Sequence, residues 1–243
     1  MTGDAGSERL TGVAKEAQSL QARYRKRARR TTSGRYSVFD RAHLMALQQR
    51  DRCLLQQLRA AGCSDLGRLR ILDVGCGFGQ DLVRFVSWGA RPELLVGIDA
   101  LPERCEAAQR LHPGIRILQA NAAALPFPDG SFDVALQFTT MSSILDEAVR
   151  FSAAAEINRV LAPGGLLIWY DFWLNPINRE THGISPKEIR ALLPGYHGRL
   201  RRLTLAPPLA RAVGHFGHLP IALLQGLWPF QTHYLGVLQS PEH

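Results

Sequence analysis

The stretch ILDVGCGFGQD, residues 71–81, decides the fold of this chain. It joins a short apolar run, typical of a buried strand, to three glycines on alternate positions and then to a segment of helical character. Glycines let the backbone turn sharply and let a ligand approach where a Cβ atom would collide. The following helix presents unpaired backbone N–H groups beside such a ligand. By itself, the stretch fits a nucleotide-type ligand site and an ordinary tight turn equally well.

The spacing of the glycines separates several kinds of ligand site. A dinucleotide fingerprint would place its third glycine where this chain has Gln80. A phosphate-binding P-loop is excluded because no Gly-Lys-Ser/Thr follows. Asp99 closes the apolar run 94–99, where a carboxylate can accept hydrogen bonds from both hydroxyls of a ribose. The alternative role of Asp99 is to cap a helix that starts near Pro102, but its place at the end of a strand favours the ribose.

Strands and helices alternate outward from this stretch. Buried strands are predicted at 71–74, 94–99, 115–120, 132–138 and 165–170, and helices at 40–61, 81–90, 103–112 and 145–161. Alternation with nearly continuous apolar strands indicates a parallel sheet covered on both faces. Two last strands, 199–205 and 232–239, complete the predicted fold class: α/β, with a doubly wound, seven-stranded, mostly parallel sheet.

Composition and charge narrow the class of protein. The 243 residues carry a formal net charge of +8, and residues 1–40 hold nine Lys or Arg against four acids. A surface for nucleic acid along the whole chain would spread its charge differently. No apolar run has the length of a membrane span, and no signal peptide is evident, so we expect a cytoplasmic protein. The four cysteines lack metal-ligand spacing and are predicted to be reduced thiols.

Four stretches together resemble a known family: ILDVGCGFG, LLVGIDAL, ANAAALPFPDGSFDVALQF and EINRVLAPGGLLIWYDF. They are similar to class I S-adenosylmethionine-dependent methyltransferases of the small-molecule type, over about residues 69–172. The resemblance implies a Rossmann-like methyltransferase fold and S-adenosylmethionine as the cofactor. It also implies three parts of the chain: a flexible N-terminus at 1–21, a basic, helical cap or lid at 22–61, and the catalytic domain at 62–243.

The resemblance further implies roles for individual positions. The aspartate and glycines of the first motif would hold the methionine moiety, Asp99 the ribose, Leu101 the adenine ring, and Asn121 with Ala122 the adenine edge. Gln137 would lie near the methionine end. Many members have Asp where this chain has Asn121, so the charge-assisted bond to the exocyclic amine is absent. The complete predicted cofactor set is Asp73, Gly75, Cys76, Gly77, Gly79, Asp99, Ala100, Leu101, Asn121, Ala122, Gln137, Tyr24 and Tyr36.

Methyl transfer from a sulfonium needs alignment of the acceptor and, for a hydroxyl or protonated amine, a base. The predicted catalytic candidates are Asp171, His182 and His233. Asp171 directly follows the strand 165–170, at the edge where open sheets bind ligands, although a role in a turn is an equal alternative. Each lone histidine is more often structural. No carboxylate pair or His/Cys cluster has metal-ligand spacing, so no metal is predicted.

Three functions remain open at this stage. The leading hypothesis is methyl transfer to an oxygen or nitrogen of a small-molecule acceptor. The second is methylation of RNA or another acidic macromolecule docked on the basic segment 23–35, although nothing there interleaves aromatic residues with the cations and nucleic acid is not the favoured partner. The third is a non-catalytic cofactor-binding partner protein. The apolar insertion 205–231 would wall the acceptor site, form a homodimer contact or close the core.

Overall fold

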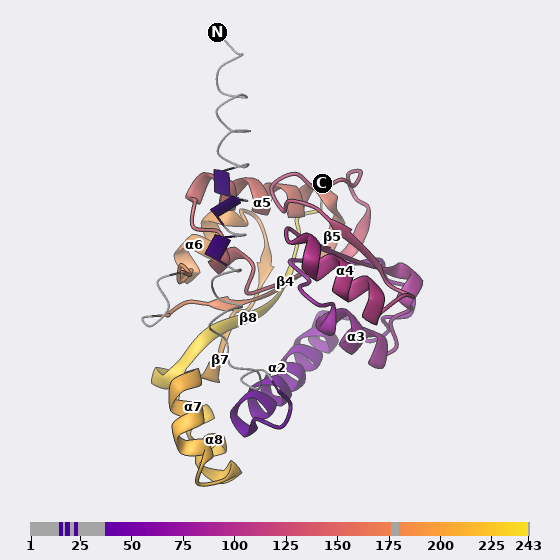
Figure 1. The fold of residues 1–243 in the computed structure, drawn as a ribbon. Helices are drawn as coiled ribbons and strands as arrows, with labels where there is room; N and C mark the ends of the chain where they lie inside the picture. The colour runs from indigo at the N-terminus through magenta and orange to yellow at the C-terminus, as the bar shows by residue number, and fades with distance from the viewer. Residues whose placement is uncertain (1–14, 17, 20–21, 24–36, 176–179, 243) are drawn as a thin grey trace.

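The fold is described from a computed structural model, which covers residues 15–16, 18–19, 22–23, 37–175 and 180–242 (Figure 1). One mixed sheet runs through it, in the order β3-β2-β1-β4-β5-β8-β6, and β7 also pairs with β8. The strands are β1 Ile71–Val74, β2 Leu95–Asp99, β3 Arg116–Gln119, β4 Phe132–Phe138, β5 Leu161–Phe172, β6 His197–Gly198, β7 Arg201–Leu205 and β8 Gln231–Gln239. The first five are parallel, and β8 is antiparallel to β5.

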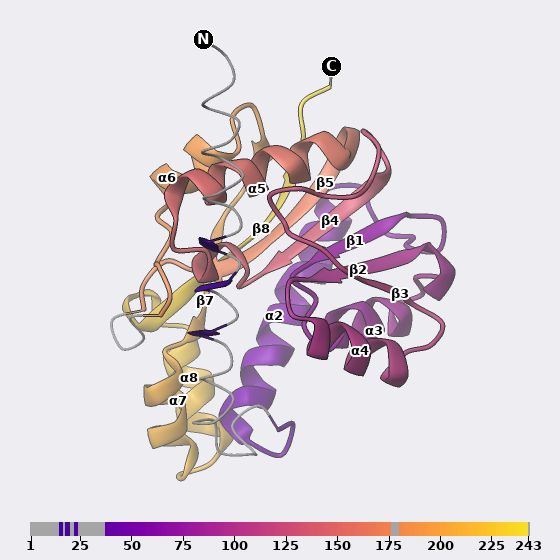
Figure 2. The same cartoon turned by 45° about the horizontal axis from the view of Figure 1, so that its top comes forward.

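Helices cover both faces of this sheet (Figure 2). The helices are α2 Arg41–Ala60, α3 Gln80–Ser87, α4 Pro102–Leu111, α5 Glu147–Val160, α6 Pro186–Leu192, α7 Pro207–Gly214 and α8 His218–Gln225, with short 3-10 turns η1 Pro92–Leu94, η2 Met141–Ser143 and η3 Trp228–Phe230. One apolar core joins α2, α3 and α4 to the sheet. The other joins α5 and α6 to its opposite face. This is the doubly wound arrangement that the sequence predicts.

Local sequence signals set several helix ends. Asp40 begins α2 by accepting a hydrogen bond from the N–H of His43 at 2.8 Å, and Asp146 does the same for Val149 in α5 at 3.0 Å. A side-chain oxygen at such a position satisfies a backbone donor that the helix leaves unpaired. Three of the four predicted helices lie within two residues of their expected limits, whereas α3 ends at Ser87, three residues earlier than expected.

Two details differ from the prediction. The sheet has eight strands, because the two-residue β6 adds an antiparallel partner beside β8. The fifth strand begins at Leu161, four residues earlier than expected, and contains Pro163 and Gly164. A shift of register between Phe132 and Val134 accommodates this start. The carboxyl ends of the parallel strands lie within two residues of their expected positions, and β5 ends at Phe172, so that it includes Asp171.

The N-terminal region divides into two parts. Helix α2 packs against the sheet through Leu54 and Leu58, which are fully buried. It is thus part of the main core. Residues 24–36 lie outside the described residues, so the cap over 22–61 stays a prediction. The insertion between β7 and β8 folds into α7, α8 and η3, which pack on the first half of α2.

Candidate functional site

The glycine loop after β1 is held by the end of β2. The N–H groups of Gly75 and Cys76 both donate to one carbonyl oxygen of β2, at 2.8 Å each. Gly75, Gly77 and Gly79 have φ values of 79°, 57° and 77°, a region that other residues rarely adopt. A Cβ atom on Gly77 would meet only the guanidinium of Arg104, at 4.0 Å. The loop therefore leaves open space at its centre.

The residues after β4 contact this loop from the other side. Thr140 donates its hydroxyl to the carbonyl oxygen of Val74 at 2.7 Å, and a Cβ atom on Gly75 would collide with the same threonine. Thr139 has a φ of 58°, a strained value for a β-branched residue that persists only where the surroundings impose it. Its N–H donates to the carbonyl oxygen of Tyr170 at 2.7 Å. Hydrogen bonds to β1 and β5 therefore hold the two residues after β4 in place beside the glycine loop.

Gln137, near the end of β4, is fully buried, and its amide is only half satisfied. The oxygen Oε1 accepts the N–H groups of Thr140 and Met141, both at 3.2 Å. The nitrogen Nε2 forms no close hydrogen bond among the described residues, although it lies near enough to the carboxyl group of Asp171 to lower the pKa of that group. An orphaned buried donor costs about 1–3 kcal/mol. This amide is therefore suited to donate to a molecule bound at the edge.

Two carboxyl groups flank the loop, Asp73 in β1 and Asp99 at the end of β2. Asp99 accepts the N–H of Gly77 at 3.0 Å and the N–H of Leu101 at 2.9 Å, and Arg104 lies 3.7 Å away. Each of its oxygens can still accept a further bond. Asp73 is buried without a hydrogen bond from the described residues. Burial, together with nearby carboxylates, holds the pKa of Asp73 well above its usual range, which favours its protonated, donating form.

The residues expected beside an adenine ring follow β2 and β3. Ala100, Asn121 and Ala122 are half-buried, whereas Leu101 is buried. The side-chain oxygen of Asn121 accepts the N–H of Ala123 at 2.9 Å, so it also stabilises the local turn. The predicted cofactor residues that the structure gathers along this edge are Asp73, Gly75, Cys76, Gly77, Gly79, Asp99, Ala100, Leu101, Asn121, Ala122 and Gln137. Tyr24 and Tyr36 lie outside the described residues.

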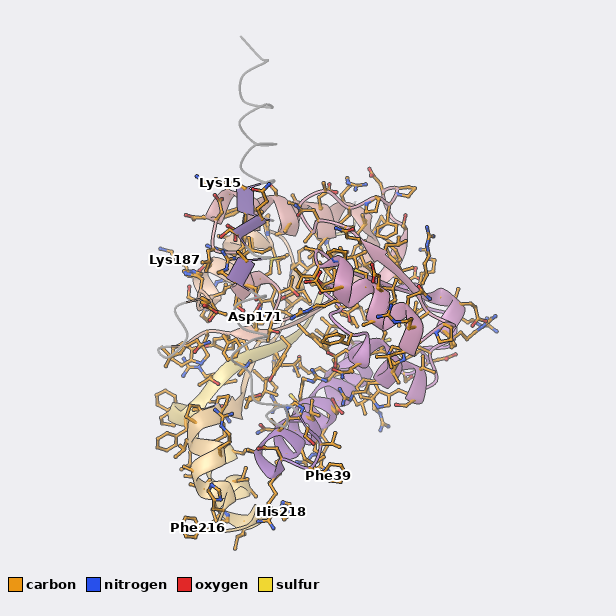
Figure 3. The ribbon with its side chains drawn as sticks, viewed as in Figure 1. Lys15, Phe39, Asp171, Lys187, Phe216 and His218 are labelled. Atoms are coloured by element: carbon orange, nitrogen blue, oxygen red, sulfur yellow. The ribbon has the colours of Figure 1, made fainter. Side chains whose placement is uncertain are left out.

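Asp171 is the acidic side chain at the carboxyl end of β5, in the middle of the molecule in Figure 3. It is 1% exposed, and its oxygens accept the N–H of Ser142 at 2.9 Å and the N–H of Phe172 at 2.8 Å. Burial raises the pKa of Asp171 to about 6, partly opposed by hydrogen bonds, those of Ser142 first. A carboxyl group with such a pKa can give and take a proton near neutral pH.

His182 joins this region through its backbone. Its N–H donates to the carbonyl oxygen of Ser142 at 2.8 Å, and the N–H of that serine binds Asp171. The imidazole itself is exposed, and its Nε2 lies 3.1 Å from a carboxylate oxygen of Glu188. The same glutamate binds the guanidinium of Arg150. The structure therefore places the His182 side chain in a surface ion cluster next to the edge.

His233 lies on the opposite face of the sheet from Asp171. Tyr234 is the residue of β8 that pairs with Asp171, and successive side chains of a strand point to opposite faces. The His233 ring stacks on Tyr170, with centroids 4.7 Å apart and planes 8° apart. Burial first, and then the cation of Arg50, lowers the pKa of His233 to about 3. The structure thus does not bring the histidine and Asp171 together, and the imidazole is held neutral.

Two residues at this edge, Arg50 and Thr140, were not among the residues predicted from the sequence. Arg50 is buried, with its guanidinium 4.8 Å from the ring centroid of Phe138 and 2.5 Å from the carboxylate of Asp81. A signal for it existed: Arg50 stands three residues after Leu47, on the apolar face of the helix predicted at 40–61. The signal for Thr140 was a pair of hydroxyl residues directly after the strand 132–138.

No three His, Cys, Asp or Glu side chains of residues 37–175 and 180–242, or of the described N-terminal residues, are grouped to hold a metal ion. Within the described part of the chain, no helix combines the length and the apolar character of a membrane span.

Comparison with known proteins identifies this edge. The family model described as "Methyltransferase domain" matches residues 71–165. That range begins with β1, contains the glycine loop, Asp99 and Gln137, and ends in β5. Over these residues the chain is similar to S-adenosylmethionine-dependent methyltransferases. The open loop, the orphaned amide of Gln137 and the remaining acceptor sites of Asp99 fit the cofactor of that family, S-adenosylmethionine.

Relatives of this methyltransferase include enzymes with different acceptors. The chain is 34% identical over 123 residues to a phthiotriol/phenolphthiotriol dimycocerosates methyltransferase of Mycobacterium leprae, covering 50% of this chain and 43% of that protein. It is 29% identical over 161 residues to the 27-O-demethylrifamycin SV methyltransferase of Amycolatopsis mediterranei, covering 60% and 57%. The chain spans about half the length of the curated relatives it matches.

Solved structures show the same fold at low sequence identity. A putative sarcosine dimethylglycine methyltransferase from Galdieria sulphuraria superimposes with a TM-score of 0.60 at 16% identity, covering 80% of this chain and 86% of that one. Similarity at this level shows the fold alone, because one fold hosts many functions. The acceptor of this methyltransferase has to be argued from its own residues.

Proposed function

We propose that this protein transfers a methyl group from S-adenosylmethionine to an oxygen or nitrogen of a small-molecule acceptor. The observation that carries the proposal is the shared edge: the open glycine loop, Asp99 and the unpaired amide of Gln137 lie at the carboxyl ends of adjacent parallel strands. Ligands of open α/β sheets bind at that edge. The relatives described above are named as methyltransferases of different small molecules, which supports a small-molecule acceptor.

Different residues along the edge would bind different parts of the cofactor. The N–H groups and the open space of the loop 75–79 would hold the methionine end of the cofactor, with the amide of Gln137 donating to it. Asp99 would accept the ribose hydroxyls, and Ala100, Leu101, Asn121 and Ala122 would enclose the adenine. The cofactor supplies a methyl group on a sulfonium, which is a strong electrophile. The protein has to align the acceptor with it and exclude water.

Asp171 is the side chain that we assign to proton transfer from the acceptor. It lies next to Gln137, and its pKa is raised to about 6 by burial. The backbone N–H of His182 is bonded to Ser142 in the same region. The imidazole of His182 would bind a polar part of the acceptor once it no longer contacts Glu188. His233 is stacked and neutral, so it would shape the opposite wall of the edge. The cytoplasm supplies the cofactor, so we place the protein there.

The domain boundaries belong to the same proposal. Residues 62–243 would form the catalytic domain, residues 1–21 a flexible start, and residues 22–61 a cap in which α2 is the fixed part. Removing residues 1–40 would leave α2 and the sheet intact. The truncated protein should keep its circular dichroism spectrum and bind cofactor nearly as well, but turn over more slowly because water enters the site. Turnover at the wild-type rate would contradict the cap.

Calorimetry with S-adenosylhomocysteine tests the cofactor site. The wild-type protein should bind one equivalent, and Asp99→Asn should weaken binding by on the order of 1–3 kcal/mol, because hydrogen bonds to a charged acceptor are lost. The matched control is Asp133→Asn, since Asp133 pairs with Arg70 at the start of β4, away from the loop. Equal affinity of both variants would overturn the assignment of Asp99. Absence of S-adenosylhomocysteine production with a panel of hydroxyl and amine acceptors would count against methyl transfer itself.

A further inference from the structure

Helices α7 and α8 and the turn η3 form a unit that extends from the sheet at the same edge as Asp171 (Figures 1 and 2). The unit leaves the end of β7 and returns at the beginning of β8, and β8 is antiparallel to β5. Its inner side packs on α2 through Ala42, Ala210 and Ile221, all buried. Its outer side is free of contacts that would bury it within the described chain.

The outer side of this unit is apolar. Eight of the fifteen large, exposed apolar side chains in the described ranges lie on it or on the residues just before α2. We call the following residues the apolar ridge: Phe216, Leu219, Leu223, Leu227, Trp228 and Phe230. Phe216 is 82% exposed and Trp228 is 67% exposed. Figure 3 shows Phe216 and His218 at the far tip of the unit, with Phe39 nearby at the beginning of α2. A clustered apolar surface of this kind marks an interaction site.

The charges around the ridge are mostly positive. Residues 189–241 contain five arginines and no Asp or Glu. A hollow of about 390 Å³ beside the ridge is lined by Arg41, Arg211 and His215, together with Phe39. Its one acidic lining residue, Asp40, is bound to a backbone N–H at the start of α2. The partner of this surface therefore has to be apolar inside and anionic outside.

We propose that the apolar ridge docks on the surface of an anionic lipid bilayer. Leucine and aromatic side chains would enter the boundary between headgroups and acyl chains, where tryptophan is favoured. Arg41 and Arg211 would face the phosphates. A second copy of this chain is a poorer occupant, because two basic surfaces would repel each other. The inference concerns a surface apart from the cofactor loop, so it stands whether or not the proposed acceptor class is right.

Cosedimentation of the full chain with vesicles tests this. The protein should bind vesicles of phosphatidylcholine with phosphatidylglycerol, bind pure phosphatidylcholine weakly, and detach in part at high salt. Leu219→Glu should lower the partition coefficient by about tenfold or more, because a leucine no longer enters the bilayer. The matched control is Leu111→Glu on α4: Leu219 is 69% exposed and Leu111 is 64% exposed, so both variants should fold and the control should bind like wild type.

A second measurement starts from the wild-type protein. The tryptophan emission of the wild-type protein should move to shorter wavelength when phosphatidylglycerol vesicles are added, and Trp228→Phe should remove that shift. The proposal is overturned if the wild-type protein ignores anionic vesicles, or if Leu111→Glu weakens binding as much as Leu219→Glu. A concentration-dependent dimer in light scattering that Leu219→Glu dissolves, without vesicle binding, would assign the ridge to a second copy instead.

Discussion

The carboxyl edge of the sheet has two halves that consist of different kinds of chemical group. Around β1, β2 and β4, the edge consists of backbone N–H groups, glycines and carboxyl groups, as in the loop 75–79 with Asp99. Around β5, β7 and β8 it consists of stacked rings and cations, as in Tyr170, His233 and Arg202, whose guanidinium lies 4.3 Å from the ring of Trp173. The first half suits a ligand of fixed shape. The second half presents side chains instead of backbone groups.

The two halves also control protons in different ways. In the first half, Asp73 is held toward its protonated form by burial and neighbouring carboxylates. In the second half, burial and a cation hold the imidazole of His233 neutral. Both environments disfavour the charged form of the buried group. On unfolding in acid, however, the imidazole of His233 takes up a proton, whereas Asp73 does not. The pH dependence of stability therefore separates them.

The largest expected effect comes from His233→Phe. The pKa of His233 is about 3 in the folded protein and near 6.5 in the unfolded chain, so the unfolded state takes up the proton first as the pH falls. Stability from this group is fully present above about pH 6.5 and is lost toward pH 3, by about 5 kcal/mol in total. The phenylalanine keeps the stacking on Tyr170 and removes the titration. Urea denaturation at several pH values should show a flatter acid limb than in wild type, whereas the exposed His197→Gln should keep the wild-type limb.

The next effect concerns a single methyl group in the first half. Gly75→Ala should lower the free energy of unfolding by about 2–4 kcal/mol, because the added Cβ meets Thr140 at a positive φ. It should also weaken S-adenosylhomocysteine binding. Gly89→Ala is the control, since Gly89 has a φ of 103° with no atom within 4 Å of an added Cβ, and should cost only about 1 kcal/mol. If both variants lost the same free energy of unfolding, backbone strain and not the contact with Thr140 would make the loop sensitive.

A smaller effect is expected where the halves meet, at Arg50. Arg50→Gln removes the ion pair with Asp81 and the cation over Phe138. The loss should be about 2 kcal/mol, because Arg84 still pairs with Asp81 at 3.0 Å. The control Arg91→Gln breaks the exposed pair with Glu93 and should leave the melting temperature unchanged. A melting temperature that Arg50→Gln leaves unchanged would mean that the two halves do not depend on this pair.

No effect is expected from metal removal. The sequence has no carboxylate pair or His/Cys cluster with metal-ligand spacing, which is why no metal is predicted. Production of S-adenosylhomocysteine in the presence of an acceptor should therefore continue in excess chelator. Restoration of a lost activity by added magnesium would contradict this.

Short-range sequence patterns predicted the first half nearly completely. Strand β4 was found at its expected limits, 132–138, and the acid that closes β2 was expected at Asp99. The glycines of the loop have positive φ values, which are compatible with the sharp turn expected there. These features follow from the sequence because each depends on residues a few positions apart: an apolar run, a turn and a helix start. The strands then meet at one edge because parallel connections allow it.

Only the tertiary structure decided the second half. Asp171 and His233 looked alike as polar residues of late strands, but the register of β5 with β8 puts them on opposite faces. The burial of Arg50 against β4 and β5 joins residues almost ninety positions apart, and the exposure of the ridge on α8 depends on which side packs on α2. Sequence periodicity tells which residues share a face, but not which other element covers that face. Long-range packing decides which element covers a face, and the energy of that packing is distributed over the whole core.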